Sequence, residues 1–318
     1  MIKEGATSAF VEYSREFHNW NLQAGLRYEH VGFDYYNNGK YIAKQSKIYN
    51  HIFPSITFGF PIKGVQLQIG YASDIVRPGY WQLSSNTTYA NRYLYDKGNP
   101  FLMPSITHNV TLGASYEWMN LYVGYSHVKD AITTQTIAYS EDDPTIAMMT
   151  VLNVPEYDKL VASINFSPSI GCWTPQLGLS LQKQWYEGET PQGKEKFNKP
   201  VGGITFRNNF KLPKGFLLDI NGSWMTKGYL ENIYLVDNPI DLSASLSKSF
   251  LKDNLTLQLR ADDILEPKQV ATFYSGLRVM QDTYYFHRQI TFTLRYKFNS
   301  TRSKYKGTGA GEGQKSRM

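Results

Sequence analysis

Long hydrophobic runs are missing from this chain of 318 residues. No window approaches the roughly 18 consecutive apolar residues that a membrane-spanning helix needs, so the sequence excludes a helical membrane protein. The mean hydropathy of −0.41 is that of a soluble chain on average. A search for long apolar runs does not detect transmembrane β-strands, because polar residues that face the interior of a barrel alternate with the apolar ones in every strand.

Cysteine is almost absent as well. Cys172 is the single thiol, which excludes an internal disulfide framework and any metal site built from several thiolates. The six histidines have no carboxylate or second histidine at metal-ligand spacing, and no catalytic motif accompanies them. We therefore expect no metal, no cofactor and no enzymatic activity.

The net charge is small outside the C-terminal tail. The net charge is +6, and the residues after Phe298 hold five basic side chains against one acidic side chain. The small net charge of the rest of the chain forms no basic stripe, so no nucleic-acid partner is expected. A secretory signal is also missing: residues 1–5 lead straight into strand-like sequence, which predicts that export depends on sequence preceding this chain.

The chain has instead a strict alternation of polar and apolar residues. In residues 289–298 the apolar positions are Ile, Phe, Leu, Tyr and Phe, and the positions between them are Gln, Thr, Thr, Arg and Lys. A period of two places these sets on opposite faces of one strand. The pattern recurs along nearly the whole chain, and aromatic residues make up 15% of it. Together these features predict an all-β protein, a transmembrane antiparallel β-barrel with aromatic girdles.

About thirteen such strands can be counted, and their connections alternate in length. Short turns are expected at residues 18–19, 61–64, 119–120, 167–173, 212–215 and 251–254, and long polar loops at 37–44, 74–104, 129–158, 187–199, 228–240 and 262–288. Short periplasmic turns and long extracellular loops are typical of outer-membrane barrels. Residues 145–154 are an alternative extra strand within one loop.

An odd strand count predicts an incomplete barrel, because bacterial single-chain barrels close with even numbers. We expect residues 1–298 to be the C-terminal portion of such a barrel, and residues 299–318 to be a basic, Gly/Ser-rich disordered tail. By itself the chain would leave two strand edges unpaired, which is costly in lipid.

One loop carries a motif. It reads Arg77-Pro78, Tyr80 and Leu83, followed by Gly98-Asn99-Pro100, Leu102 and Pro104. This arrangement closely resembles the C-terminal barrel of TonB-dependent outer-membrane receptors, in particular the outer-membrane β-barrel family proteins. The resemblance implies about twenty-two strands, a plug domain inside the barrel, TonB and the barrel-assembly machinery as partners, and the outer membrane of a Gram-negative bacterium as the location. The nutrient taken up would be an iron chelate, cobalamin, a glycan or a peptide.

Four residues of this loop are candidate ligand contacts: Arg77, Tyr80, Trp81 and Asn99. A cation beside two aromatics can hold an anionic chelate, or the aromatics can stack on a sugar ring. The structural alternative is that Pro78 ends the sheet pairing and that the aromatics belong to the outer girdle. Asn99 would then simply shape the turn that returns the chain to the next strand.

Six polar residues are expected to face the lumen: Arg27, Glu29, Gln68, Gln258, Arg260 and Arg295. In a receptor they would contact the plug, and in an open channel they would set ion selectivity. Two other functions stay open at this point, a passive porin-like or structural barrel without a plug and a soluble β-protein that binds carbohydrate.

Overall fold

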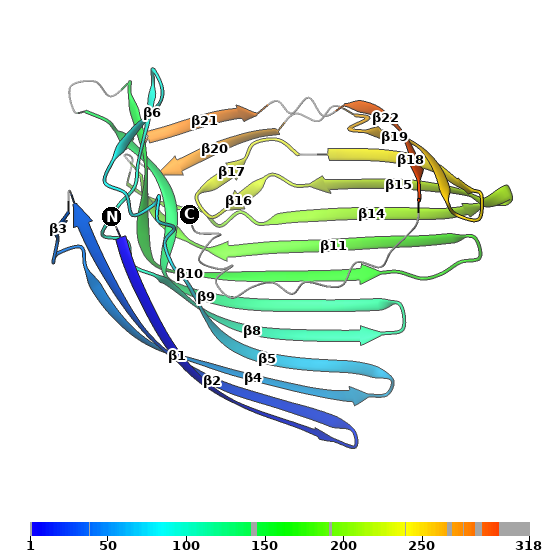
Figure 1. Cartoon of the computed structure of the whole chain (residues 1–318), viewed down its shortest axis with the longest axis horizontal. Coiled ribbons are helices and arrows are strands. Elements are labelled where there is room, and N and C mark those ends of the chain that lie inside the picture. Colours follow the sequence, from blue (N-terminus) through cyan, green and yellow to red (C-terminus); the bar gives the residue numbers. More distant parts are fainter. Residues whose placement is uncertain are drawn as a thin grey trace.

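The computed structural model describes residues 2–37, 39–140, 145–190, 193–238, 240–265, 269–275, 277–283 and 288–298. Its main feature is one curved antiparallel sheet in which each long strand pairs with the next (Figure 1). Thirteen strands follow this path: β1 (Ile2–Phe17), β2 (Trp20–Asn37), β4 (Lys47–Ile62), β5 (Val65–Val76), β8 (Ser105–Tyr116), β9 (Met119–Ala138), β10 (Ala147–Phe166), β11 (Trp173–Trp185), β14 (Val201–Leu212), β15 (Phe216–Met225), β18 (Ile240–Phe250), β19 (Leu255–Asp262) and β22 (Gln289–Tyr296). The predicted count is confirmed.

The strand register brings the apolar residues of neighbouring strands together on one face. Ile56, Tyr71, Val110, Tyr125 and Leu160 are successive partners across five strands. Directly opposite residues of an antiparallel pair share a face, so these side chains form one continuous surface, the outer face. The same rule extends this face to the last three strands, with the partners Leu246, Leu259 and Phe292.

Aromatic rings collect on the outer face where the short turns lie, which we call the turn end. Phe17 and Trp20 stack with their ring centroids 3.6 Å apart, and Trp173 and Phe210 are 6.0 Å apart. Aromatic side chains favour the boundary between the hydrocarbon core of a membrane and water. These pairs therefore mark one edge of the apolar band.

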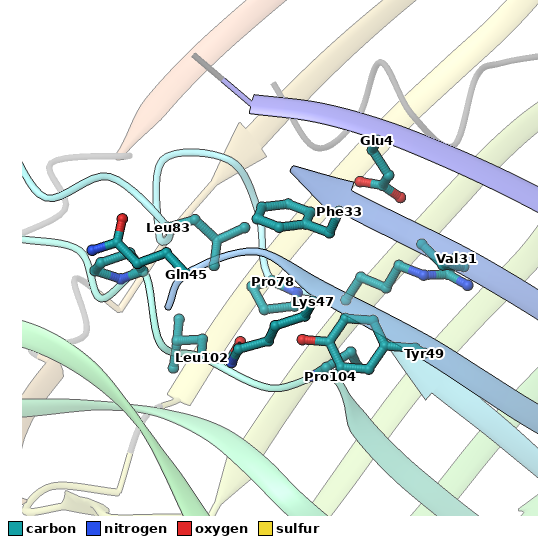
Figure 2. Close-up of a pocket in the computed structure, with 12 residues that line it drawn as sticks. Glu4, Val31, Phe33, Gln45, Lys47, Tyr49, Pro78, Leu83, Leu102 and Pro104 are labelled. Carbon is teal, nitrogen blue, oxygen red and sulfur yellow. The ribbon is translucent and has the colours of Figure 1, made fainter. Parts of the chain in front are cut away.

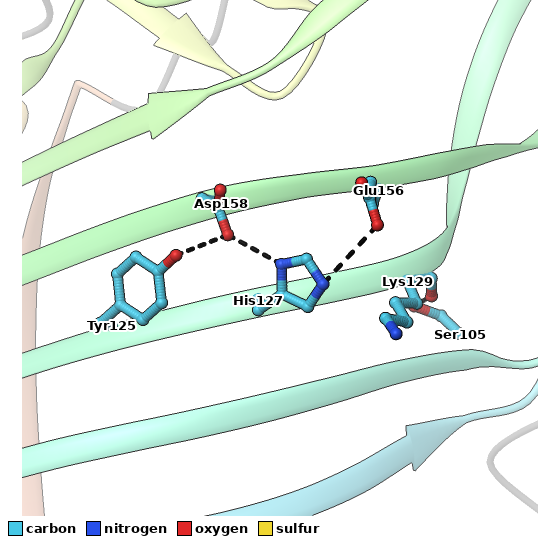
Figure 3. Close-up of polar contacts among 6 residues, drawn as sticks. All are labelled: Ser105, Tyr125, His127, Lys129, Glu156 and Asp158. Atoms are coloured by element: carbon cyan, nitrogen blue, oxygen red, sulfur yellow. Dashed lines mark hydrogen bonds and ion pairs between the residues drawn. The ribbon is translucent and has the colours of Figure 1, made fainter.

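Polar side chains mark the other edge of the band, at the loop end of β9 and β10 (Figure 3). Tyr125 donates a 2.7 Å hydrogen bond to Asp158, whose carboxylate also lies 2.8 Å from Nδ1 of His127. Nε2 of the same ring is 3.7 Å from Glu156. His127 and Asp158 are direct partners next to the apolar pair Tyr125 and Leu160. The side chains of the outer face therefore change from apolar to ionisable between one cross-strand pair and the next.

Two sequence-based boundaries were wrong. Residues 129–158 are largely strand, because β9 and β10 continue as a long hairpin that bends away from the other strands near Asp130, whose φ is 51° (Figure 1). The alternative extra strand at 145–154 is the first part of β10. The turn placed at residues 119–120 lies at 117–118, where Glu117 has a positive φ of 46°.

The remaining long connections contain small strands at the loop end. These are β3 (Lys40–Tyr41), β6 (Thr87–Asn91), β7 (Leu94–Lys97), β12 (Glu187–Thr190), β13 (Gly193–Lys196), β16 (Gly228–Leu230), β17 (Ile233–Leu235), β20 (Gln269–Ser275) and β21 (Leu277–Thr283). One of them, β7, pairs in parallel with β10. A single 3-10 turn, η1 (Pro213–Gly215), links β14 to β15. Among the described residues, no helix is of the length and apolarity needed to cross a membrane.

The sheet does not close on itself. Within the described ranges β1 pairs only with β2, and β22 pairs only with β19, so the two end strands lie apart (Figure 1). The expectation of an incomplete barrel is confirmed. The predicted tail, residues 299–318, lies outside the described residues.

The two faces give a first prediction. Leu257 shares the outer face with Lys248 and Leu294, whereas its neighbour Gln258 faces inward with Ser247 and Thr293. Leu257→Arg should lower the free energy of unfolding by about 2–4 kcal/mol if the residue lies near the bilayer midplane. Gln258→Arg is the matched control and should change it by less than about 1 kcal/mol. Urea titration of the protein in lipid vesicles measures both, and equal losses would contradict the face assignment.

Candidate functional site

The loop between β5 and β8, residues 77–104, folds back over the inner face of β1, β2 and β4; we call it the docked loop (Figure 2). Beyond Glu29, the inner-facing positions of β2 turn apolar, with Val31, Phe33 and Tyr35 all buried. Leu83 and Leu102 of the loop, 3% and 2% exposed, pack on this strip. Burying these side chains favours docking by roughly 2 kcal/mol each. The loop is thus part of a hydrophobic core that lies on the inner face of the barrel sheet.

An ion network fixes the start of the docked loop. Arg77 pairs with Oε2 of Glu29, and Arg27 pairs with Oε1 of the same carboxylate at 2.5 Å. The Glu29 side chain is only 10% exposed, whereas that of Arg27 is 40% exposed. The guanidinium of Arg27 also lies 4.7 Å from the ring centre of Phe53. Because the carboxylate is shared, Arg77 is committed to the barrel wall and does not stand ready for an anionic ligand.

Tyr80 is committed in the same way. Its hydroxyl donates a 3.3 Å hydrogen bond to Glu4, which lies on the inner face of β1 opposite Phe33. The structural alternative that placed Tyr80 and Trp81 in the outer girdle is therefore wrong for Tyr80. Docking of the loop on the inner face overrides the aromatic preference for the membrane boundary.

The second half of the motif ties the loop to β10. The side-chain amide of Asn99 donates to the Val151 carbonyl at 3.1 Å, and its oxygen accepts from the Phe101 amide at 2.9 Å. A Cβ at Gly98 would lie 2.5–2.6 Å from three backbone carbonyl oxygens, so only glycine fits there. Asn99 thus holds the loop, and both its side-chain groups are in use.

Two cavities border the docked loop. The one beneath it, lined by Lys47, Tyr49 and Leu102 among others, measures about 20 Å³, the size of one water molecule (Figure 2). It is packed core. The other measures about 310 Å³ and lies between the docked loop, which contains the β6–β7 hairpin, and strands β9 and β10. Trp81, which is 63% exposed, forms part of its wall. Of the four candidate ligand residues, Trp81 lines this larger cavity and Arg77 lines the smaller one.

A second core lies under the neighbouring connections. Gln184, 1% exposed, donates to the carbonyls of Phe197 and Glu231 and accepts from the Glu231 amide. Tyr186 and Phe197 are fully buried beside it, and burial raises the pKa of Tyr186 to about 12. The connections at the loop end are thus anchored to the sheet by packing.

The six lumen candidates do not gather in one site. Arg27 and Glu29 lie under the docked loop, and Gln68 lies in the turn-end half between Gly59 and Gly113 of the adjacent strands. On the last strands, Gln258 donates to Ser245 at 3.4 Å and Arg260 pairs with Asp262 at 2.7 Å. Arg295 faces inward opposite Thr256. All six point away from the outer face.

Two grooves cross the inner wall of the turn-end half. One of about 460 Å³ is lined by Asn21, Gly59, Gln66 and Gln68 with parts of two turns. Another of about 350 Å³ lies over Gly178, beside Asn165 and Gln176. Glycines lie in both grooves, and amides line them together with Glu16 in the first and Arg207 in the second. Sequence reasoning found Gln68 but missed the grooves, because the glycines meet the amides only across strands.

Metal ligation has no geometric support within the described part of the chain. No group of three or more His, Cys, Asp or Glu side chains is arranged to hold an ion there. The pairing of His127 with Asp158 and Glu156 was missed from the sequence, since these residues are about thirty positions apart.

Comparison with known proteins places the chain in a family. A sequence profile described as "Outer membrane protein beta-barrel family" matches residues 2–296, and the chain belongs to that family. The protein is accordingly a barrel protein of the Gram-negative outer membrane, and the soluble alternative is wrong. No curated protein matches the sequence.

Solved structures with the same fold include an iron transporter and a siderophore receptor. The FrpB iron transporter from Neisseria meningitidis (F5-1 variant) has a TM-score of 0.63 at 14% identity, over 93% of this chain and 46% of that one. The siderophore receptor PiuA from Acinetobacter baumannii has a TM-score of 0.60 at 14% identity, over 93% and 44%. The chain thus spans less than half the length of these proteins.

Proposed function

We propose that the chain forms part of an outer-membrane receptor that carries a scarce nutrient inward, with energy supplied through TonB and a plug domain inside the barrel. The observation that carries the proposal is the match of 93% of the chain to barrels of an iron transporter and a siderophore receptor. The proposal leaves four nutrient classes, an iron chelate, cobalamin, a glycan or a peptide, and it assigns the chain no catalytic step.

The inner wall supports a plug. Gln68 stands between glycines on both neighbouring strands, and the groove there is also lined by the amides of Asn21 and Gln66. An amide both donates and accepts hydrogen bonds, which suits the backbone of a packed protein domain. Channels that select ions by charge use rings of charged side chains instead. The amides around Gln68 therefore suit a packed domain against this part of the wall.

The loop end supports a receptor in a second way. The docked loop and the connection containing Phe197 both pack inward onto the sheet through buried side chains. Such packing narrows the mouth of the barrel and places loop residues where a ligand enters.

Uptake and conductance together test the proposal. Cells that produce the protein from its complete gene should accumulate one member of a panel containing ferric chelates, cobalamin, oligosaccharides and peptides, and deletion of TonB should abolish the uptake. The purified protein should give no steady single-channel conductance in planar bilayers. Steady conductance together with TonB-independent uptake would instead establish the passive porin-like barrel.

A further inference from the structure

The open cavity beside Trp81 is the feature of the docked loop that the proposed function does not yet explain. We infer that it is a binding site for a neutral carbohydrate, of the size of a mono- or disaccharide. This inference names the ligand class of the proposed receptor and so rests on that function. The juxtaposition that carries it is one exposed tryptophan, a wall of hydroxyls and a balanced pair of charges.

The tryptophan supplies a flat apolar wall. Trp81 is 63% exposed, whereas Leu83 and Leu102 of the same loop are almost fully buried. One edge of its ring faces Gly79, where a Cβ would lie 3.2 Å from Nε1. The electron-rich face of an indole attracts the C–H groups on one side of a sugar ring. An exposed ring inside a cavity therefore fits a sugar.

The remaining walls supply hydrogen bonds of both kinds. Ser84, Thr88, Thr134 and Thr150 contribute hydroxyls, and Asn86 contributes an amide. Each hydroxyl donates one bond and accepts others, and the amide does both. A sugar ring carries several hydroxyls and also an apolar face, and Met149 and Val151 extend the apolar wall beside Trp81. The volume of about 310 Å³ lies at the lower end of the range of small-molecule sites, roughly 300–1,000 Å³.

The cavity carries no net charge. Asp96 and Lys97 both line it and cancel, and neither makes a side-chain hydrogen bond or ion pair within the described ranges. Asp96 stands opposite Thr88 in the β6–β7 hairpin, so its carboxylate can accept from a ligand hydroxyl. Arg77, another cation of the docked loop, is paired with Glu29 and does not line this cavity. The cavity thus favours a neutral ligand.

Binding to an array of neutral and acidic oligosaccharides tests the site, with protein made from the complete gene and purified in detergent. A neutral saccharide should bind, and Trp81→Ala should weaken its binding by about tenfold or more. Trp81→Phe should restore most of the affinity, because it keeps a flat ring. Phe101→Ala is the matched control: this residue is 56% exposed in the same loop but does not line the cavity, and its binding should equal that of the parent.

Asp96→Asn keeps the shape of the hairpin, and it provides a second test if Trp81→Ala does not fold. This variant should also bind the neutral saccharide more weakly than the parent. The inference would be overturned if only acidic saccharides bind or if no neutral saccharide binds. Binding by both variants that equals that of the parent would also overturn it. TonB-dependent uptake of a ferric chelate that Trp81→Ala leaves intact would likewise overturn it, while the receptor function stands. Saccharide binding that depends on Trp81 without TonB-dependent uptake would support the site and overturn the receptor function.

Discussion

Replacing Phe298 by aspartate is expected to abolish assembly of the protein into the outer membrane. Tyr296 shares the outer face with Leu255, and the Lys297 amide still bonds to the Asn254 carbonyl at 2.8 Å, so the extended backbone continues to Phe298. Alternation then puts Phe298, 80% exposed and 4.6 Å from the Tyr296 ring, at the lipid-facing end of the last strand. The substitution removes the terminal aromatic and places a charge there. The amount of heat-modifiable protein in outer membranes measures the effect.

The inner-facing neighbour provides the control. Lys297→Asp changes the charge at the adjacent position without altering the lipid-facing edge, and it should leave assembly nearly unchanged. Deletion of residues 301–318 should also be silent, because this segment is rich in Gly, Ser, Lys and Arg and lacks apolar alternation. If the deletion removes the protein from the membrane while Phe298→Asp assembles normally, the insertion signal lies in the tail and not in the strand.

Replacing Glu29 by alanine should destabilise docking of the loop by about 3–5 kcal/mol, because two arginines then lose their shared and largely buried partner. Both Arg27 and Arg77 pair with this one carboxylate, and Arg77 is the first residue of the docked loop. The expected result is rapid cleavage within residues 77–104 by a protease that leaves the parent protein intact. Limited proteolysis followed by mass spectrometry locates the cut.

Glu12→Ala is the matched control. Glu12 lies on the inner face of β1 and accepts a 2.8 Å hydrogen bond from Gln23, but it is exposed. Its loss should cost less than about 1 kcal/mol. The double variant Glu29→Ala, Arg77→Met should be cleaved more slowly than Glu29→Ala alone, because it removes a cation left without its partner. Equal protection of Glu29→Ala and the parent would show that apolar packing alone holds the loop.

Local alternation determined much of this protein. A period of two was enough to predict the thirteen strands, to assign Leu257 and Gln258 to opposite faces, and to place most of the short turns, because each of these features depends on residues a few positions apart. The same reasoning placed Arg27 and Glu29 on one face. It also identified residues 77–104 as a loop that carries a motif, though not what the motif does.

The tertiary structure alone decided that role. Glu29 meets Arg77 across 48 positions, Asn99 meets Val151 across 52, and Tyr80 meets Glu4 across 76. Such contacts exist only after the sheet has curved and brought distant strands under one loop. The apolar strip of β2 beyond Glu29 follows the same period of two as the lumen-facing polar residues, so its sequence gives no sign that a loop will cover it. Which of the candidate residues holds the loop and which lines a cavity therefore depends on the fold, since alternation specifies a face but not what packs against it.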